Sequence, residues 1–437
     1  MAGKEQQADC LLGFAQADTY ETGAYLTRWS AEDAARLLGV EEEYGDACRR
    51  RDYALGKVER SRIDALYGPT LNLSASQVDR QAECRFSYFL RYGLRVQERK
   101  EATVDPAEFG TYVHAVLENT ARCIRDMGGF HTVSQEETLA IARRFSDEYA
   151  REHFSQLDSE RLAYLFRRNS LELDMVVKEL WLELKDALFE PRDFEVNFGG
   201  EGGLPPIAIP NGSMNAILRG FIDRMDTWVQ GATTYYRVVD YKTGKKDFDY
   251  CDVFNGVGLQ MLLYMFALRE SGGDSLGEHP VAAGVQYFPA RAPYLSSDGR
   301  LEGEEAEKER RKEWKRRGLL LLDEQVLQAM EPGESPQRMC YTVKKDGTLS
   351  GDLADRDQLK LLEKYVFRVL GKMVEDIASG NVDPNPYTRG SSHSACAFCP
   401  YGAICHKESV AGRRNYKTMT AQRFWEEIGK EMDRNGR

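Results

Sequence analysis

Two stretches of the 437-residue sequence constrain its fold most, because both have the composition of β-strands. Ile217–Val229 and Thr234–Tyr241 are rich in β-branched and aromatic residues, and a short segment containing Gly231 separates them. Such a pair of runs predicts an antiparallel hairpin. Residues 282–288 predict a further, buried strand. Apolar residues at three- and four-residue steps predict helices before, between and after these strands in the sequence, over residues 106–127, 135–189, 256–269 and 355–378.

Capping patterns predict two helix starts. Ser74 followed by Gln77 has the spacing of a capping box and predicts a helix that runs toward Tyr92. Asp105 followed by Pro106 predicts an N-cap and a first helical position. Residues 303–317 are dense in Glu, Lys and Arg and predict a solvated helix, with a DNA-contacting face as the alternative.

The composition is that of an ordinary globular protein, with 42% hydrophobic and 30% charged residues. A formal net charge of −11 argues against a protein that coats nucleic acid, but it leaves room for a local basic groove. The longest apolar run, Met261–Leu268, is too short to cross a bilayer, and the N-terminus has no signal-peptide core. We therefore expect a cytoplasmic protein whose clustered cysteines bind metal rather than form disulfides.

Asp240 and Lys242 give the strongest catalytic signal. Side chains alternate along a strand, so these two point to the same side, and Asp223 on the preceding strand lies within reach across the hairpin. Two carboxylates and a lysine suit phosphodiester hydrolysis. The carboxylates would hold Mg²⁺ or Mn²⁺, and the lysine would orient the attacking water and offset negative charge. Taken alone, an Asp-x-Lys pattern is more often a surface salt bridge.

Two further pairs, each with members four residues apart on a predicted helix, accompany this motif. Gly110 would let another backbone or a substrate come close, and His114 can coordinate a metal; the alternative is a structural histidine. Gln260 and Tyr264 would position the lysine or a phosphate; the alternative is a half-buried polar pair.

Taken in order, Gly-x-x-x-His, Gly-Phe-Ile-Asp, Asp-Tyr-Lys and Gln-x-x-x-Tyr resemble the motifs of the RecB-like branch of the PD-(D/E)XK nuclease superfamily. The resemblance implies a restriction-endonuclease-like α/β fold, in which helices flank a mixed β-sheet. It also implies a site with three kinds of residue: metal ligands at His114, Asp223, Asp240 and the peptide carbonyl of Tyr241, a catalytic Lys242, and supporting Gln260 and Tyr264.

Three of the nine cysteines crowd into ten residues near the C-terminus, at Cys396, Cys399 and Cys405. Structural zinc and iron–sulfur sites mostly take four ligands. His393 and His406 are the local candidates for a fourth, so a zinc knuckle is one interpretation.

The cysteines also resemble those of the AddB component of bacterial AddAB helicase–nucleases and of Cas4-type nucleases, in which one cysteine precedes the nuclease motifs and three follow. Cys84 occupies that first position, although Arg85 stands where those families usually have proline. The resemblance implies a 4Fe–4S cluster that is held by Cys84, Cys396, Cys399 and Cys405 and staples the two ends of the domain together. The other cysteines are interpreted as ordinary thiols: Cys10, Cys48, Cys123, Cys251 and Cys340.

The resemblance to AddB extends from about Leu71 to the C-terminus. It implies a RecB-like nuclease domain at residues 71–437, with residues 1–70 as the tail of a missing helicase-like region. Such a domain would process DNA ends with an AddA-like partner and cut the 5′-ended strand. The sequence has no Gly-x-x-x-x-Gly-Lys-Ser/Thr loop, so ATP hydrolysis is not expected. The alternatives are a stand-alone Cas4-like nuclease and a non-catalytic scaffold that binds DNA ends.

Overall fold

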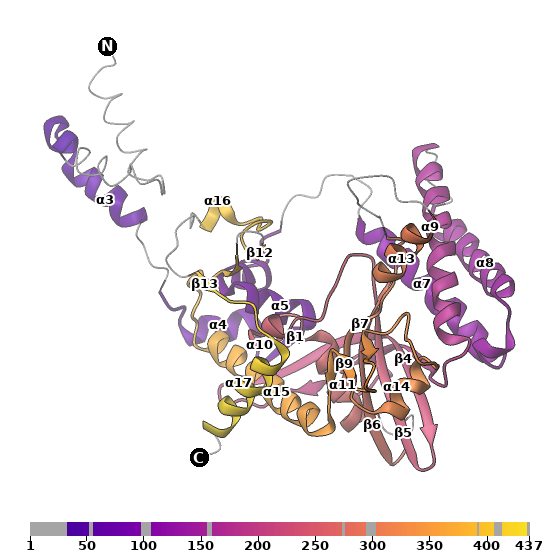
Figure 1. Ribbon diagram of the computed structural model, residues 1–437. Coiled ribbons are helices and arrows are strands. Elements are labelled where there is room, and N and C mark those ends of the chain that lie inside the picture. Colours follow the sequence, from indigo (N-terminus) through magenta and orange to yellow (C-terminus); the bar gives the residue numbers. More distant parts are fainter. Residues whose placement is uncertain are drawn as a thin grey trace.

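A mixed β-sheet forms the centre of the molecule (Figure 1). The computed structural model describes residues 33–51, 56–97, 106–154, 160–272, 276–293, 303–390, 393–405 and 413–434. In this part of the chain, eight strands follow the path β1-β4-β5-β6-β7-β10, with β2 and β3 paired to β4. Their bounds are β1 Thr70–Ser74, β2 Glu190–Phe198, β3 Ile207–Ala208, β4 Asn215–Gln230, β5 Thr233–Lys242, β6 His279–Pro289, β7 Arg317–Leu321 and β10 Leu353–Ala354. The predicted fold class is confirmed.

Strands β4 and β5 form the predicted hairpin. They pair antiparallel from Gln230–Thr233 to Arg224–Val239. The turn between them contains Gly231 at a φ of 61°, a left-handed conformation that glycine adopts without strain. Strand β6 pairs parallel with β5, so the predicted buried strand is confirmed and β5 is a central strand of the sheet.

Helices occupy the stretches predicted at residues 106–127, 135–189, 256–269 and 355–378, with bounds shifted by a few residues and two helices, α8 and α9, within 135–189. Helix α7 begins at Pro106, and its predicted cap Asp105 lies outside the described residues. Asp355 caps α15 through the N–H groups of Asp357 and Gln358. None of the described helices is both long and apolar enough to span a bilayer. The helices are α3 Glu41–Arg51, α4 Arg60–Tyr67, α5 Ala75–Glu83, α6 Arg85–Tyr88, α7 Pro106–Asp126, α8 Gln135–Phe154, α9 Glu160–Leu184, α10 Tyr250–Phe254, α11 Gln260–Ser271, α13 Gly303–Glu313, α14 Glu324–Met330, α15 Arg356–Ala378, α16 Gly402–Cys405 and α17 Ala421–Arg434, with a short 3-10 turn η2 at Phe130–Thr132.

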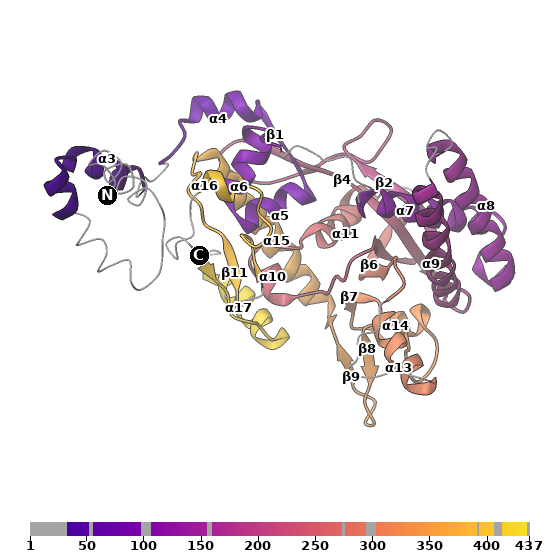
Figure 2. The same cartoon turned by 90° about the horizontal axis from the view of Figure 1, so that it is seen from above.

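Helices cover both faces of the sheet, and Figure 2 shows α7, α8 and α9 on one side of it with α10, α15 and α17 on the other. Alternate residues of β5 enter two separate apolar clusters. Tyr236 and Val238 pack with residues of α11 and α15, whereas Val239 and Tyr241 pack with residues of α7 and α9. The period-two alternation of a strand buried on both faces produces this division.

The helix that starts at Ser74 does not run unbroken toward Tyr92; that prediction was wrong. The capping box of Ser74 and Gln77 is present and starts α5. At Cys84, however, the backbone is extended, with φ −165° and ψ 117°. Helix α6 and a π-helical turn, η1 at Phe89–Gly93, then follow.

The C-terminal segment accounts for this break. The Asn385 side chain accepts the Arg85 N–H at 2.9 Å, and Arg414 donates to the carbonyl oxygens of Ala82 and Glu83. Backbone groups that would bond within a continuous helix therefore bond to a distant part of the chain. Both views place the yellow α16 beside the violet α5–α6 region (Figures 1 and 2). Two smaller sheets complete the strands: β8 Tyr341–Val343 with β9 Leu349–Gly351, and β11 Tyr387–Arg389 with β12 His393–Ser394 and β13 Arg414–Asn415.

A buried network of charged side chains joins α9 to the sheet. Glu183 accepts hydrogen bonds from Arg224, Arg237 and Arg316 at 2.6 to 3.0 Å. Asp226 accepts from Arg224 and Arg237, and all five side chains are fully buried. Burial alone would raise the pKa of Glu183, but the three guanidinium groups outweigh burial and lower it to about 2.

Glu183→Gln should lower the free energy of unfolding at pH 7 by about 3–5 kcal/mol, because it leaves buried guanidinium groups without a compensating charge. The folded-state pKa lies below the ordinary value of 4.5, so this stabilisation is present above that pH and is lost as the pH falls toward 2. Urea unfolding at pH 7 and pH 3 measures both effects. Glu179→Gln is the control, since its less buried carboxylate also contacts Arg316, and it should cost about 1 kcal/mol. Equal unfolding midpoints for wild type and Glu183→Gln at pH 7 would contradict the prediction.

Candidate active site

The predicted carboxylates lie where β4 changes its neighbour in the sheet. The first part of β4 pairs with β1, and its last part pairs with β5. Asp223 lies between these parts, just beyond the last hairpin pair, Arg224–Val239. There its carboxylate Oδ2 accepts the Tyr241 N–H at 2.7 Å. Asp240 follows Val239, so two carboxylates meet at the point where the strands separate.

Asp240 and Lys242 share one side of β5, as strand alternation predicts. Lys242 Nζ lies 2.6 Å from Asp240 Oδ2, and Asp240 is only 5% exposed. Burial raises the pKa of Asp240 to about 6, although the neighbouring Lys242 cation lowers it. The lysine is thereby held beside the carboxylate rather than free in solvent.

His114 reaches the same point from α7. Its Nε2 donates to the Tyr241 carbonyl oxygen at 2.8 Å, and its Nδ1 lies 3.4 Å from Asp223 Oδ2. Burial lowers the pKa of His114, but the contacts with Asp223 and the Tyr241 carbonyl raise it by more. The imidazole, the carboxylates and the carbonyl oxygen predicted as metal ligands are thus brought together.

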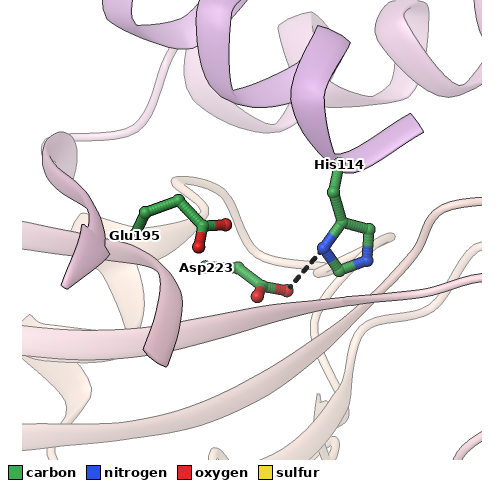
Figure 3. A group of neighbouring side chains, drawn as sticks. All are labelled: His114, Glu195 and Asp223. Atoms are coloured by element: carbon green, nitrogen blue, oxygen red, sulfur yellow. Dashed lines mark ion pairs between the residues drawn. The ribbon is translucent and has the colours of Figure 1, made fainter. Parts of the chain in front are cut away.

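Glu195 on β2 also belongs to this cluster, although no motif in the sequence predicts it. The ladder pairs on either side place it opposite Asp223, and its φ of 48° is uncommon for a residue other than glycine. One possible ligand atom from each of His114, Glu195 and Asp223 lies within 4.8 Å of the other two. Figure 3 shows the His114 side chain pointing from its helix toward Asp223 and Glu195 on the strands below. Spacing in the sequence gives no signal for Glu195, because a long connection separates β2 from β4.

The cluster is short of positive charge. Glu195 is exposed at the protein surface, yet partial desolvation raises its pKa to about 7; the carboxylates of Asp223 and Glu118 raise this pKa further, whereas His114 and Arg122 lower it. Burial and the negative charge of Asp223 likewise raise the pKa of Asp240. A divalent cation would supply the missing charge, and carboxylate, carbonyl and imidazole donors suit Mg²⁺ or Mn²⁺. The residues present therefore fit a metal of this kind.

Gln260 and Tyr264 support the strand that carries Asp223. Tyr264 makes hydrogen bonds with the Gln260 side chain and with the backbone of Phe221. Burial raises the pKa of Tyr264 to about 12, so its hydroxyl stays protonated. A Cβ on Gly220 would lie 1.8 Å from the Tyr264 Oη atom, so only glycine permits this approach. Tyr264, which hydrogen-bonds to Gln260, thus contacts β4 directly before Asp223.

Gly110 was predicted to let another backbone or a substrate come close. A Cβ at this position would have one heavy atom of the described residues within 4 Å, Thr243 Oγ1 at 3.9 Å. Outside its own helix, no backbone atom of the described residues therefore lies within 4 Å of such a Cβ, and the close approach of a substrate stays a prediction. The open space beside Gly110 instead adjoins the residue after Lys242.

A basic groove begins at Lys242. Its volume is about 330 Å³, and basic side chains outnumber acidic ones along its walls. Lys245 pairs with Glu313 at 3.5 Å, and Arg317 pairs with Asp247 at 3.4 Å. The basic residues are Lys242, Lys245, Lys246, Arg291, Lys315 and Arg317. The end of the charged segment predicted at residues 303–317 thus lines the groove, while α13 itself is mostly exposed.

The cysteines assigned to a cluster meet at the junction of the two chain ends. Cys84, Cys399 and Cys405 pack in one small apolar cluster with Tyr401 and neighbouring residues of α6. Desolvation raises the pKa of the Cys396 thiol, and the nearby thiols of Cys84 and Cys399 raise it further. Of the alternative ligands, His406 and the side chain of His393 lie outside the described residues.

Comparisons with known proteins give a consistent picture. A model of the PD-(D/E)XK nuclease superfamily matches residues 72–406, a range that contains every site residue predicted above. The chain is 32% identical over 406 residues to the B subunit of an ATP-dependent helicase/deoxyribonuclease from Acetivibrio thermocellus, with 89% of this chain and 35% of the relative covered. It is 34% identical to the protein of the same name from Moorella thermoacetica, with 86% of this chain and 33% of the relative covered. The chain spans about a third of the length of these relatives.

Proposed function

The chain belongs to the PD-(D/E)XK nuclease superfamily, and from this membership and the geometry of the site we propose that it is a metal-dependent deoxyribonuclease domain acting on DNA ends. The observation that carries the proposal is the convergence of His114, Asp223, Asp240 and Lys242 at the point where β4 changes partners. Three separate elements contribute to this point. Such a meeting of donors and a cation is expected of a phosphodiesterase site and not of a surface salt bridge.

His114, Asp223, Asp240 and the Tyr241 carbonyl would hold Mg²⁺ or Mn²⁺, with Glu195 beside them. The bound metal would activate water and offset charge on the phosphate. Lys242 stays next to this site through its ion pair with Asp240, and its ammonium group orients the attacking water and stabilises negative charge in the transition state.

The basic groove supports DNA as the substrate. Its surplus of positive charge stands out against a chain whose net charge is −11. Phosphates attract lysine and arginine side chains through long-range electrostatics, so a strand lying in the groove would be guided to Lys242. The groove contains Lys242 itself, and a strand bound there would therefore pass the proposed metal site.

The cysteine site would hold a 4Fe–4S cluster through Cys84, Cys396, Cys399 and Cys405. Cys84, Cys399 and Cys405 pack in one apolar cluster, and the Cys396 thiol lies near those of Cys84 and Cys399, which supports a shared site. The surrounding apolar side chains would limit access of water to it.

The relatives suggest the wider setting. They are named as B subunits of ATP-dependent helicase/deoxyribonucleases, and we propose that this chain corresponds to the nuclease portion of such a protein, working in the cytoplasm with an A-type partner on double-strand-break ends. Residues 1–70 would then adjoin a helicase-like region. A strand ending 5′ at the break is the proposed substrate.

Cleavage of end-labelled linear DNA by the purified chain tests the proposed function. We expect weak cleavage with Mg²⁺ or Mn²⁺, none with EDTA, and no stimulation by ATP, because the sequence has no phosphate-binding loop. Protein that binds DNA ends but cleaves them with neither metal would instead support a non-catalytic scaffold. Strong dependence on ATP would show that a nucleotide site exists in the chain.

A further inference from the structure

Helix α11 carries Gln260 and Tyr264, yet it lacks a cap of its own. Its N-cap position is Leu259, whose side chain offers no hydrogen-bond acceptor. An acceptor from elsewhere in the chain instead holds the two residues that precede the helix. Here the Gly258 N–H donates to Asp79 Oδ1 at 2.8 Å, and the Leu259 backbone also hydrogen-bonds to Asp79.

Asp79 lies among groups of the proposed active site. Burial raises its pKa, while the backbone N–H groups and the positive charges of Lys246 and Lys242 lower it. Lys246 Nζ is close to Gly258 as well, since a Cβ added there would lie 3.6 Å from it. Gly258 has a φ of 71°, so the turn that presents its N–H to Asp79 suits glycine. The carboxylate thus lies between the start of α11 and the basic residues that follow β5.

The same helix leads to the cysteine site. Asp79 is on α5, which ends at Glu83, and Cys84 follows at once. The break after α5 is held by Arg414 and Asn385 from the C-terminal segment. A helix of this length is rigid, so Asp79 and Cys84 keep a fixed separation.

From these contacts we propose that Asp79 is a positioning residue for the nuclease reaction: it holds the start of α11, and through Gln260 and Tyr264 the Asp223 strand, in register with the cysteine site. This inference rests on the proposed function. Tyr264 reaches the Phe221 backbone beside Asp223, so a shift at the start of α11 reaches a proposed metal ligand. Loss of the iron–sulfur cluster would loosen α5, and the resulting shift of Asp79 would be transmitted to the active site through α11.

Asp79→Ala should lower kcat for DNA cleavage by about 10- to 100-fold, because small displacements of a catalytic group have effects of this size. The KM for DNA and the iron content should change by less than about threefold, since neither binding site is removed. Asp79→Asn keeps an acceptor oxygen and should restore most of the activity. Hydrogen exchange at Gly258, Leu259 and Gln260 should accelerate in Asp79→Ala and stay near wild type in Asp79→Asn.

Asp323→Ala is the matched control, because Asp323 caps α14 through the Gln325 and Val326 N–H groups. This change also removes a carboxylate that accepts backbone N–H groups at a helix start, but outside the proposed site, so kcat should be unchanged. In a double-mutant cycle, Cys84→Ser and Asp79→Ala together should lower kcat by less than the product of their separate effects. If the wild type is active, an unchanged kcat or unchanged hydrogen exchange in Asp79→Ala would overturn the inference. It would also be overturned if the two substitutions lowered kcat by the full product of their separate effects. An inactive wild type with accelerated exchange in Asp79→Ala would overturn the proposed function instead.

Discussion

Lys242→Ala should remove metal-dependent DNA cleavage, with a loss in kcat of about 10³-fold or more. The lysine has no replacement in its position, since its ammonium group is the one paired with Asp240 at the end of β5. The fold should persist, because Lys242 is a third exposed and contributes little to the core. Asp223→Ala and Asp240→Ala should be equally inactive for a different reason, the loss of metal affinity. Mn²⁺ titration alongside the cleavage assay separates the two causes.

Lys360→Ala is the control for this series. Lys360 is an exposed residue of α15 that pairs with Asp357, so the change removes one positive charge away from the groove. It should cleave DNA at the wild-type rate. Wild-type cleavage by purified, folded Lys242→Ala would reject the assignment of the catalytic lysine and, with it, the proposed role of the Asp240–Lys242 pair.

Cys84→Ser should lose its iron as completely as Cys399→Ser, although the two positions are far apart in the sequence. Both cysteine side chains belong to one apolar cluster, so each substitution should remove a ligand from the same site. Anaerobically purified wild type should be brown and contain about four irons per chain. Both variants should be colourless, less stable and poor at binding DNA ends.

The loss of stability has an upper bound. Cys84 and Cys396 are roughly 310 positions apart, and closing such a loop is worth about 5 kcal/mol in the simple entropy estimate. The variants should lose less than this, because Arg414 and the hydrogen bond from the Tyr401 hydroxyl to the Val96 carbonyl still join the two ends. Thermal unfolding measures the difference.

Cys123→Ser is the matched control and should keep its colour and its stability. Cys123 lies on α7, where its sulfur contacts Met127 and Arg144. One zinc and no iron in protein made without oxygen would reject the iron–sulfur cluster. If Cys84→Ser retains all of its iron, only the assignment of Cys84 as a ligand is rejected. His393 or His406 would then be the candidate for the fourth ligand.

Features that depend on neighbours in the sequence could be predicted. The β4–β5 hairpin follows from two strand-like runs joined by a glycine-containing turn, and its register follows from the turn. Side-chain alternation on β5 then places Asp240 and Lys242 together, as their 2.6 Å ion pair shows. The helix starts at Ser74 and Asp355 are local as well, because a capping side chain reaches N–H groups only two or three residues away.

Features that depend on contacts between distant segments were decided by the tertiary structure alone. Glu195 enters the metal-ligand cluster only because β2 pairs with β4, and nothing in its own surroundings sets that register. The helix after Ser74 breaks at Cys84 because Asn385 and Arg414 take its backbone partners. Asp79 holds the turn before a helix that begins 181 positions later in the sequence. The sequence by itself thus determined the hairpin and its paired Asp240 and Lys242, whereas long-range pairing, whose energies depend on the packed structure, decided what surrounds them.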